Sequence, residues 1–304
     1  MKNVNTMELS SQPNKVLFMG LGASGKSSIR SIVFEGKSVN DVKDYHATIN
    51  YTRSTKNIID APFQIFDCGG QESFISVFVG EQAEFIFSDV AVLIWVIDVS
   101  NFDAVSTSKF YFELALKKLA AYSERASVFC LLHKMDLLLP DMKSQVIETV
   151  KVYFAPISGL SVQYRPTSIY DQSIYSVVGE IIQTLILKSS KAQTVSEAIE
   201  QFLQSNVEMS GIAVYTDEGL PVFEGGETER IILPANLWLA SYDRLANEYQ
   251  HEEIKTVLQT NNYIFVFHVI KSQLLLTGIA KKVAPLQYVL VKMEQLSEIL
   301  NQLL

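Results

Sequence analysis

The chain has 304 residues, of which 48% are hydrophobic and 19% charged, and its net charge is −8 at pH 7. This length favours two domains, and the composition excludes a largely disordered chain. Because a domain that follows nucleic-acid phosphates is usually basic, we expect no DNA or RNA partner.

The cysteines and the two ends of the chain exclude further classes. Cys68 and Cys130 stand far apart within apolar runs, so we expect two buried free thiols in a reducing compartment. The first residues lack the apolar core of a signal peptide, and the longest apolar runs are too short to span a bilayer. We therefore expect a cytoplasmic protein that reaches a membrane surface only through a partner.

The first half of the chain alternates apolar strands with amphipathic helices. After a flexible tail at 1–13, strands are expected at 15–20, 63–66, 90–100 and 126–136, and another ends at 164–169. Helices are expected at 26–36, 107–124, after Pro140 and at 173–188. In the second of these helices, Phe110, Leu114 and Leu116 are expected to face inward. The alternation predicts an α/β fold over 14–188, with a mostly parallel sheet and helices on both faces.

In the second half of the chain, the predicted helices and strands follow a different order. A polar linker is expected at 189–193, followed by a helix that Thr194 or Ser196 would cap. The predicted order is helix, hairpin, helix, three-stranded meander and helix, at 194–205, 211–223, 234–249, 252–282 and 285–304. One tight turn of the meander is expected at Ser272-Gln273. This order predicts an antiparallel α+β domain over 194–304.

An antiparallel sheet leaves unpaired backbone groups at its edges, which must be covered or paired. We expect the second domain to form a dimer, using the strand at 211–215 or the closing helix. The alternative is that helices of the same monomer cap the edge.

The stretch GLGASGKS fits two phosphate-binding motifs. Gly20, Gly22 and Gly25 match the G-x-G-x-x-G turn of dinucleotide folds, whereas Gly20, Gly25, Lys26 and Ser27 match the G-x-x-x-x-G-K-S of a P-loop. A dinucleotide fold needs an acidic residue at the end of its second strand, where this chain has a polar loop. The P-loop hypothesis uses Lys26 for the β- and γ-phosphates and Ser27 for Mg²⁺, so it is favoured.

The stretch DCGGQ follows the predicted strand at 63–66 and suits the γ-phosphate end of a nucleotide. Asp67 supplies an acid for the magnesium shell, directly or through water, and Gly70 lets the backbone approach the γ-phosphate. Gln71 is placed to orient an attacking water. Thr48 is the candidate mobile threonine that closes over Mg²⁺ when a γ-phosphate is present.

The stretch HKMD ends a later strand and suits the guanine base. The carboxylate of Asp136 would accept from guanine N1 and the exocyclic amine, a donor pair that adenine lacks. Lys134 would lay its aliphatic stem over the base. In PTSI, a backbone N–H near Ser168 could meet the guanine oxygen. These elements occur in the order that a GTP-binding P-loop domain requires.

The predicted site combines residues from all of these stretches. The residues expected to bind nucleotide are Gly22, Ala23, Ser24, Gly25, Lys26, Ser27, Ser28, Gly70, His133, Lys134, Asp136, Ser168 and Ile169. The residues expected to act in catalysis are Gln71, Lys26 and Thr48. The residues expected to hold magnesium are Ser27, Thr48 and Asp67. Arg30 is expected to face away, and Arg53 is not expected to serve as an arginine finger, so we predict slow hydrolysis unless an activating protein assists.

Several segments resemble the Rag GTPases, called Gtr in fungi. They include KVLFMGLGASGKSSIRSIVFEG, HATIN, IFDCGGQESF, FCLLHKMDLL and YRPTSIYDQSIY. The histidine of HKMD departs from the asparagine of most small GTPases but is similar to the Rag pattern, and DCGGQ resembles the A/B half of the family. The resemblance implies that 194–304 is a roadblock-like dimerisation domain. It also implies a dimer with a related GTPase, whose nucleotide state controls partner binding in nutrient signalling.

Three classes of function follow from these residues. The favoured one is a molecular switch that binds GTP or GDP with Mg²⁺ and depends on GTPase-activating and exchange proteins. The second is a nucleotide-locked dimeric scaffold with negligible hydrolysis, against which the presence of Gln71 argues. The third is a P-loop small-molecule kinase, which would need a lid and an arginine-rich acceptor pocket that the sequence does not indicate.

Overall fold

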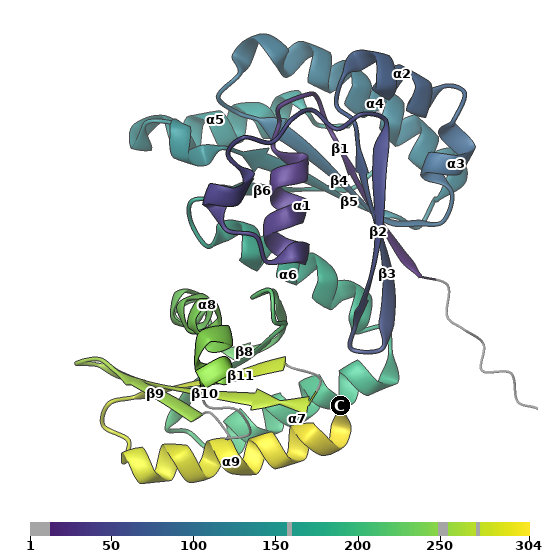
Figure 1. Ribbon diagram of the computed structural model, residues 1–304. Coiled ribbons are helices and arrows are strands. Elements are labelled where there is room, and N and C mark those ends of the chain that lie inside the picture. The colour runs from purple at the N-terminus through teal and green to yellow at the C-terminus, as the bar shows by residue number, and fades with distance from the viewer. Residues whose placement is uncertain (1–12, 157–159, 249–254, 272–273) are drawn as a thin grey trace, which may run out of the picture.

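A computed structural model describes residues 13–156, 160–248, 255–271 and 274–304 (Figure 1). The expected tail before residue 13 and the expected turn at Ser272-Gln273 lie outside the described residues. Within them the chain forms a six-stranded sheet of order β2-β3-β1-β4-β5-β6 and a five-stranded sheet of order β8-β7-β11-β10-β9. The α/β fold followed by an antiparallel α+β region is therefore confirmed.

The first sheet is mostly parallel, as expected. Its parallel strands are β1 (Asn14–Met19), β3 (Ala61–Cys68), β4 (Val90–Asp98), β5 (Ser127–His133) and β6 (Val162–Thr167). A strand that was not expected from the sequence, β2 (Tyr51–Ile58), pairs antiparallel with β3 at one edge. Much of β2 is exposed, so it lacks the apolar run that reveals the buried strands.

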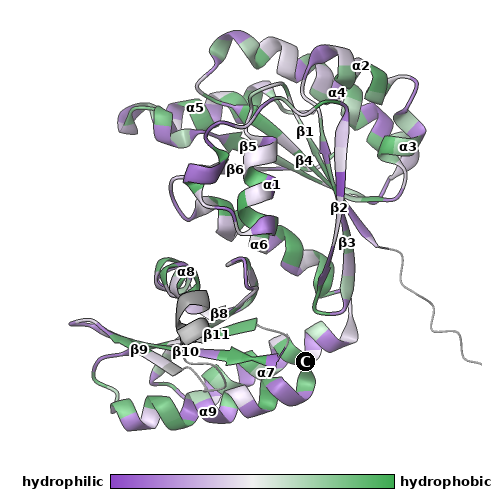
Figure 2. Ribbon diagram, viewed as in Figure 1, coloured by the Kyte–Doolittle hydropathy of each residue, from purple (hydrophilic) through white to green (hydrophobic). Residues whose placement is uncertain are grey.

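Helices cover both faces of this sheet, and alternate strand residues divide between two cores. On one face lie α1 (Lys26–Glu35) and α6 (Ser173–Ile186). On the other lie α2 (Glu72–Val79), α3 (Ala83–Phe87), α4 (Val105–Tyr122) and α5 (Pro140–Tyr153). Figure 2 shows hydrophobic colouring concentrated on the strands between these layers. Short 3₁₀ turns occur at Val39–Val42, Phe102–Ala104 and Met135–Leu137.

One inward-facing residue of α4 was predicted wrongly. Phe110 is 59% exposed, whereas Phe112, Leu116 and Leu119 are buried. These three recur at helical spacing and define the stripe that packs on the sheet. Phe110 lies outside that stripe, so its side chain points to solvent.

The second sheet is antiparallel and lies between helices. Its strands are β7 (Met209–Tyr215), β8 (Pro221–Gly226), β9 (Lys255–Gln259), β10 (Tyr263–Ile270) and β11 (Leu274–Lys281). Helices α7 (Ser190–Ser205) and α9 (Leu286–Leu303) cover one face, and α8 (Ile232–Glu248) covers the other.

Two expectations about this half were wrong. The residues expected as a linker, 189–193, lie at the start of α7, because Ser189 caps the helix by accepting from the Ala192 amide at 3.2 Å. Neither Thr194 nor Ser196 is the cap. The strand at 211–215 lies inside the sheet, hydrogen-bonded to β8 and β11, so it offers no unpaired edge. The sequence shows that these residues form a strand but not which strands become its neighbours.

The two sheets are joined by a packed contact between α6 and β8. Gly179 on α6 faces Pro221 on β8 so closely that a Cβ built on the glycine would lie 2.5 Å from Pro221 Cγ. One turn along α6, the Gln183 amide donates to Glu224 Oε2 at 3.1 Å. Figure 1 also shows the β2–β3 hairpin reaching toward α7, where Lys191 contacts Asp60. The division into domains at 14–188 and 194–304 stays a prediction.

Candidate functional site

The glycine-rich loop connects β1 to α1 at the carboxyl end of the parallel strands. Gly25 has φ +101°, a conformation that favours glycine, and a Cβ built there would lie 2.6 Å from His133 Cδ2. Helix α1 begins at the next residue, so the unpaired N–H groups of its first turn face the space above the loop. This is a local arrangement suited to binding anions.

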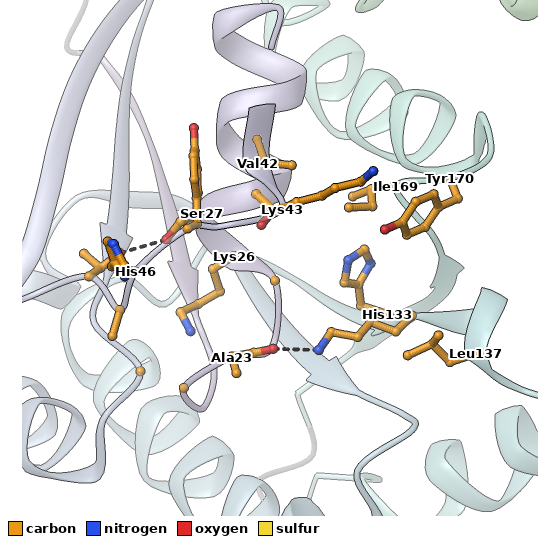
Figure 3. Close-up of a pocket in the computed structure, with 18 of the residues that line it drawn as sticks. Ala23, Lys26, Ser27, Val42, Lys43, His46, His133, Leu137, Ile169 and Tyr170 are labelled. Atoms are coloured by element: carbon orange, nitrogen blue, oxygen red, sulfur yellow. Dashed lines mark hydrogen bonds between the residues drawn. The ribbon is translucent and has the colours of Figure 1, made fainter. Parts of the chain in front are cut away.

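A cavity of about 480 Å³ lies above this loop (Figure 3). The predicted residues that line it are Gly22, Ala23, Gly25, Lys26, Ser27, Ser28, Thr48, Gly70, Gln71, His133, Lys134, Asp136 and Ile169. The remaining predicted residues, Ser24, Asp67 and Ser168, are buried behind these. The fold thus brings residues from five separate stretches of sequence to one cavity.

Part of the lining was not expected from the sequence. These residues are Val42, Lys43, Tyr45, His46, Ala47, Leu137 and Tyr170. Leu137 and Tyr170 are each 62% exposed and directly follow the predicted residues Asp136 and Ile169. The stretch before Thr48 has the composition of a polar loop and carries no recognisable motif. Its part in the site is evident only from its position in the cavity lining.

Lys26 is the most deeply placed cation of the cavity. Its side chain is 5% exposed, and Nζ donates to the Leu21 carbonyl at 2.8 Å and to Ser24 Oγ at 3.3 Å. Burial lowers the pKa of Lys26 to about 8, although the nearby Asp67 carboxylate opposes this shift. The ammonium group has neutral acceptors here, and an anion in the cavity would favour its charged form.

Three oxygen-bearing side chains gather beside Lys26. Ser27 Oγ and Thr48 Oγ1 share a hydrogen bond of 2.8 Å. Asp67 is 1% exposed, and neither of its carboxylate oxygens has a hydrogen-bond partner among the described residues. Burial raises the pKa of Asp67, while the Ser27 hydroxyl and the cations of Lys26 and Arg30 oppose the rise. Hydroxyl and carboxylate oxygens are the ligands that Mg²⁺ prefers, and the unsatisfied oxygens of Asp67 fit such an ion.

Arg30 does not face away from the site, contrary to expectation. Its Nε lies 3.6 Å from Asp67 Oδ2, and its side chain is only 15% exposed. Arg30 follows Ser27 by about one helical turn, so both side chains lie on the same face of α1. That face is turned toward the end of β3, where Asp67 stands.

The other end of the cavity is built from the ends of β5 and β6. His133 is buried, and its Nδ1 shares a hydrogen bond of 3.0 Å with Thr167 Oγ1. Burial, with help from the Lys134 cation, lowers the pKa of His133 to about 4, so the ring is neutral at neutral pH. Lys134 Nζ donates to the Ala23 carbonyl at 2.8 Å and to Asp98 Oδ2 at 2.6 Å. Lys134 thereby ties this end of the cavity to the glycine-rich loop (Figure 3).

The carboxylate of Asp136 is held in place by Ser168, whose hydroxyl donates to Asp136 Oδ1 at 2.5 Å. The amide of Ser168 donates to Ser173 Oγ at 2.9 Å, and the amide of Tyr170 donates to Ser168 Oγ at 3.0 Å. Neither amide therefore matches the donor expected near Ser168. Ile169, which stands between them, lines the cavity and becomes the candidate.

These features define a class of protein. A glycine-rich loop leads from a parallel strand into a helix with a buried lysine at its first position. A buried carboxylate, that of Asp67, stands near the carboxyl end of β3, and a carboxylate fixed by a hydroxyl, that of Asp136, follows β5. This is the arrangement of a P-loop nucleotide-binding protein.

Comparison with known proteins identifies the family. Residues 15–220 match the model described as the Gtr1/RagA G protein conserved region. The GTP-binding protein gtr1 of Schizosaccharomyces pombe is 33% identical over 226 residues, which cover 71% of this chain and 73% of that protein. The GTP-binding protein GTR1 of Saccharomyces cerevisiae is 35% identical over 193 residues, 61% of each chain. The chain belongs to the Gtr1/RagA family.

The chain is more similar to the Gtr1 proteins than to a relative from the C/D half of the family. The human Ras-related GTP-binding protein C is 29% identical over 184 residues, which cover 58% of this chain and 45% of that protein. This identity is lower than that of the two Gtr1 proteins. The expected resemblance to the A/B half is confirmed.

Proposed function

We propose that this protein is a guanine-nucleotide-dependent switch that binds GTP or GDP with Mg²⁺ and hydrolyses GTP slowly. The observation that carries the proposal is the single cavity that places Lys26 at one end, Asp136 at the other and the oxygens of Ser27 and Thr48 beside Lys26. Membership of a family of G proteins supports the choice of guanine nucleotide.

The loop and the first turn of α1, from Gly22 to Ser28, would hold the phosphates through backbone N–H groups, and Lys26 would contribute its charge. At the far end, the carboxylate of Asp136 would accept from guanine N1 and the exocyclic amine. Ser168 fixes that carboxylate from behind. The amide of Ile169 is our candidate donor to the guanine oxygen. The stem of Lys134 would cover one face of the base.

Ser27, Thr48 and Asp67 would hold Mg²⁺, which supplies charge neutralisation at the phosphates. Gln71 is exposed at the start of α2 and lines the cavity, so its side chain is free to orient a water toward the γ-phosphate. Among the described residues that line the cavity there is no arginine. No arginine of this lining would therefore meet the charge that develops on the phosphates, which supports slow hydrolysis and help from an activating protein.

The switch would act through the two stretches that line the cavity on either side of the β2–β3 hairpin. One contains Thr48 and the other contains Gln71. A γ-phosphate would order both stretches, and its loss would release them, so that partner and exchange proteins could distinguish the two states.

We propose that the second sheet forms a dimer with a related GTPase, either the same or a different one. Of its two edge strands, β8 is packed against α6 and α7, whereas β9 carries the partly exposed Val257 and Leu258. An edge strand of this kind favours pairing with another chain. In the part of the chain that the structure describes, no helix is long and apolar enough to cross a membrane. We propose that any membrane contact is made through a partner.

The alternative is a nucleotide-locked dimeric scaffold with negligible hydrolysis, and one series of measurements separates the two. The bound nucleotide is released from the purified protein and identified by chromatography, with and without magnesium during purification. Single-turnover GTP hydrolysis is then compared among the wild type, Gln71→Leu and the control Gln201→Leu, which alters an exposed residue of α7.

Guanine nucleotide that is lost on chelation, with hydrolysis about tenfold slower in Gln71→Leu alone, would support the switch. Equal rates in all three proteins would favour the scaffold. Adenine nucleotide, or no nucleotide together with no binding of labelled GTP, would refute the guanine assignment.

A further inference from the structure

Arg30 forms a buried pair of opposite charges with Asp67, one of the three proposed magnesium ligands. Arg30 Nε lies 3.6 Å from Asp67 Oδ2, and the two side chains are 15% and 1% exposed. Within the part of the chain that the structure describes, neither Arg30 Nε nor either carboxylate oxygen of Asp67 has a hydrogen-bond partner. The attraction is therefore electrostatic, through a region from which solvent is largely excluded, and salt screens it weakly.

The guanidinium is held in this position from its far end. One of its terminal nitrogens contacts Glu35, and the other donates to Ser31 Oγ at 3.3 Å. Glu35 also pairs with Lys37 at 3.1 Å, so it keeps a cation when Arg30 is removed. The contacts with Glu35 and Ser31 fix the position of Nε. This position therefore does not depend on a hydrogen bond from Nε to Asp67.

We propose that Arg30 is a positioning residue that competes with Mg²⁺ for the charge of Asp67 and so lowers the affinity of the site for the metal. This inference rests on the proposed function. An arginine stays protonated at any physiological pH, so its field acts on Asp67 whether or not the metal is bound. A divalent cation that approaches Asp67 meets a carboxylate whose charge is already partly compensated.

The same pair protects the site when the metal leaves. A buried carboxylate is costly unless cations compensate its charge, and Arg30 supplies a permanent one in addition to Lys26. The metal-free site is thereby stabilised relative to the metal-bound site. We therefore expect that the protein needs a higher Mg²⁺ concentration to retain its nucleotide when Arg30 is present than when Arg30 is replaced.

The test measures dissociation of a fluorescent GDP analogue from the full chain over a range of free Mg²⁺ concentrations. The variants are Arg30→Gln and Arg30→Met, which remove the charge, and Arg30→Lys, which keeps it. The matched control is Arg165→Gln, because Arg165 also pairs with a carboxylate, that of Glu180, but stands on β6, at the opposite end of the sheet from β2 and β3. Thermal unfolding with and without EDTA gives a second measurement that needs no catalysis.

We expect the neutral variants to lower the Mg²⁺ concentration at half-maximal retention by roughly tenfold, equivalent to about 1.4 kcal/mol. Arg30→Lys and Arg165→Gln should stay near the wild type. The neutral variants should also lose more thermal stability in EDTA than in magnesium. Arg30→Met, which keeps an aliphatic stem, decides the outcome if Arg30→Gln does not fold.

An unchanged or raised magnesium midpoint in the neutral variants would overturn the inference, as would an equal loss of stability with and without EDTA. Either result would leave the proposed function standing if the wild type binds GDP. Failure of the wild type to bind GDP at every magnesium concentration would instead overturn the proposed function and this role of Arg30 with it.

Discussion

The affinity of the site for GDP should fall as the pH rises above 8, because Lys26 must be charged to hold phosphate. Burial lowers the pKa of this lysine to about 8, and among the described residues Nζ donates to the Leu21 carbonyl and to Ser24 Oγ. Phosphate oxygens placed beside Nζ would favour the charged form and raise the pKa of Lys26 again.

The size of the effect follows from proton linkage. Above pH 8 the free site has lost the proton that the bound site keeps, so binding takes up a proton and weakens as pH rises. With a free-state pKa of about 8, the charged fraction of Lys26 falls from about 90% at pH 7 to about 10% at pH 9. The expected loss of affinity over this interval is about tenfold, or about 1.4 kcal/mol.

The assay is a titration of fluorescent GDP at constant free Mg²⁺ between pH 7 and pH 9, with the wild type and Lys26→Arg. Arginine stays protonated throughout, so this variant should bind more weakly but with a much flatter pH profile. It also corrects for titration of the nucleotide itself. Parallel profiles for the two proteins would show that Lys26 stays charged in the free site and that the burial argument is wrong.

Three further substitutions test separate parts of the structure. Gly25→Ala should destabilise the protein by about 1–3 kcal/mol in urea unfolding, because of the positive φ and the contact with His133; an unchanged midpoint would contradict this geometry. Asp136→Asn should cost about 1.5–3 kcal/mol of GDP affinity without changing the affinity for inorganic phosphate, and equal losses for both ligands would argue against a base-recognising role. Gly179→Ala should lower the free energy of unfolding by about 1–3 kcal/mol through its clash with Pro221, whereas a neutral effect would mean that α6 and β8 separate easily.

Much of the first half of the protein could be predicted from local sequence. The apolar runs of β1, β4 and β5 are buried on both faces, so composition alone distinguishes them from the helices. The glycine-rich loop, DCGGQ and HKMD each follow such a run. Because parallel strands present their carboxyl ends at one edge of a sheet, these stretches were expected to meet, and they line or back one cavity.

For two of the strands, the contacts that decided the outcome join residues distant along the chain. The exposed edge strand β2 has no continuous apolar run, and β7 became an interior strand only through pairing with β11. The start of α7 was misplaced because a serine can cap a helix at several nearby positions.

The sequence by itself determined which chemical groups the protein carries and the order in which the chain presents them. Their identity and spacing sufficed to indicate a phosphate loop, an acid after one strand and a base-recognising acid after another. Only the tertiary structure decided that Arg30 reaches Asp67 and that Ser168 holds Asp136 through its hydroxyl. Such contacts depend on how α1 and β6 pack against the rest of the sheet, and no local pattern encodes the direction of a side chain across that distance.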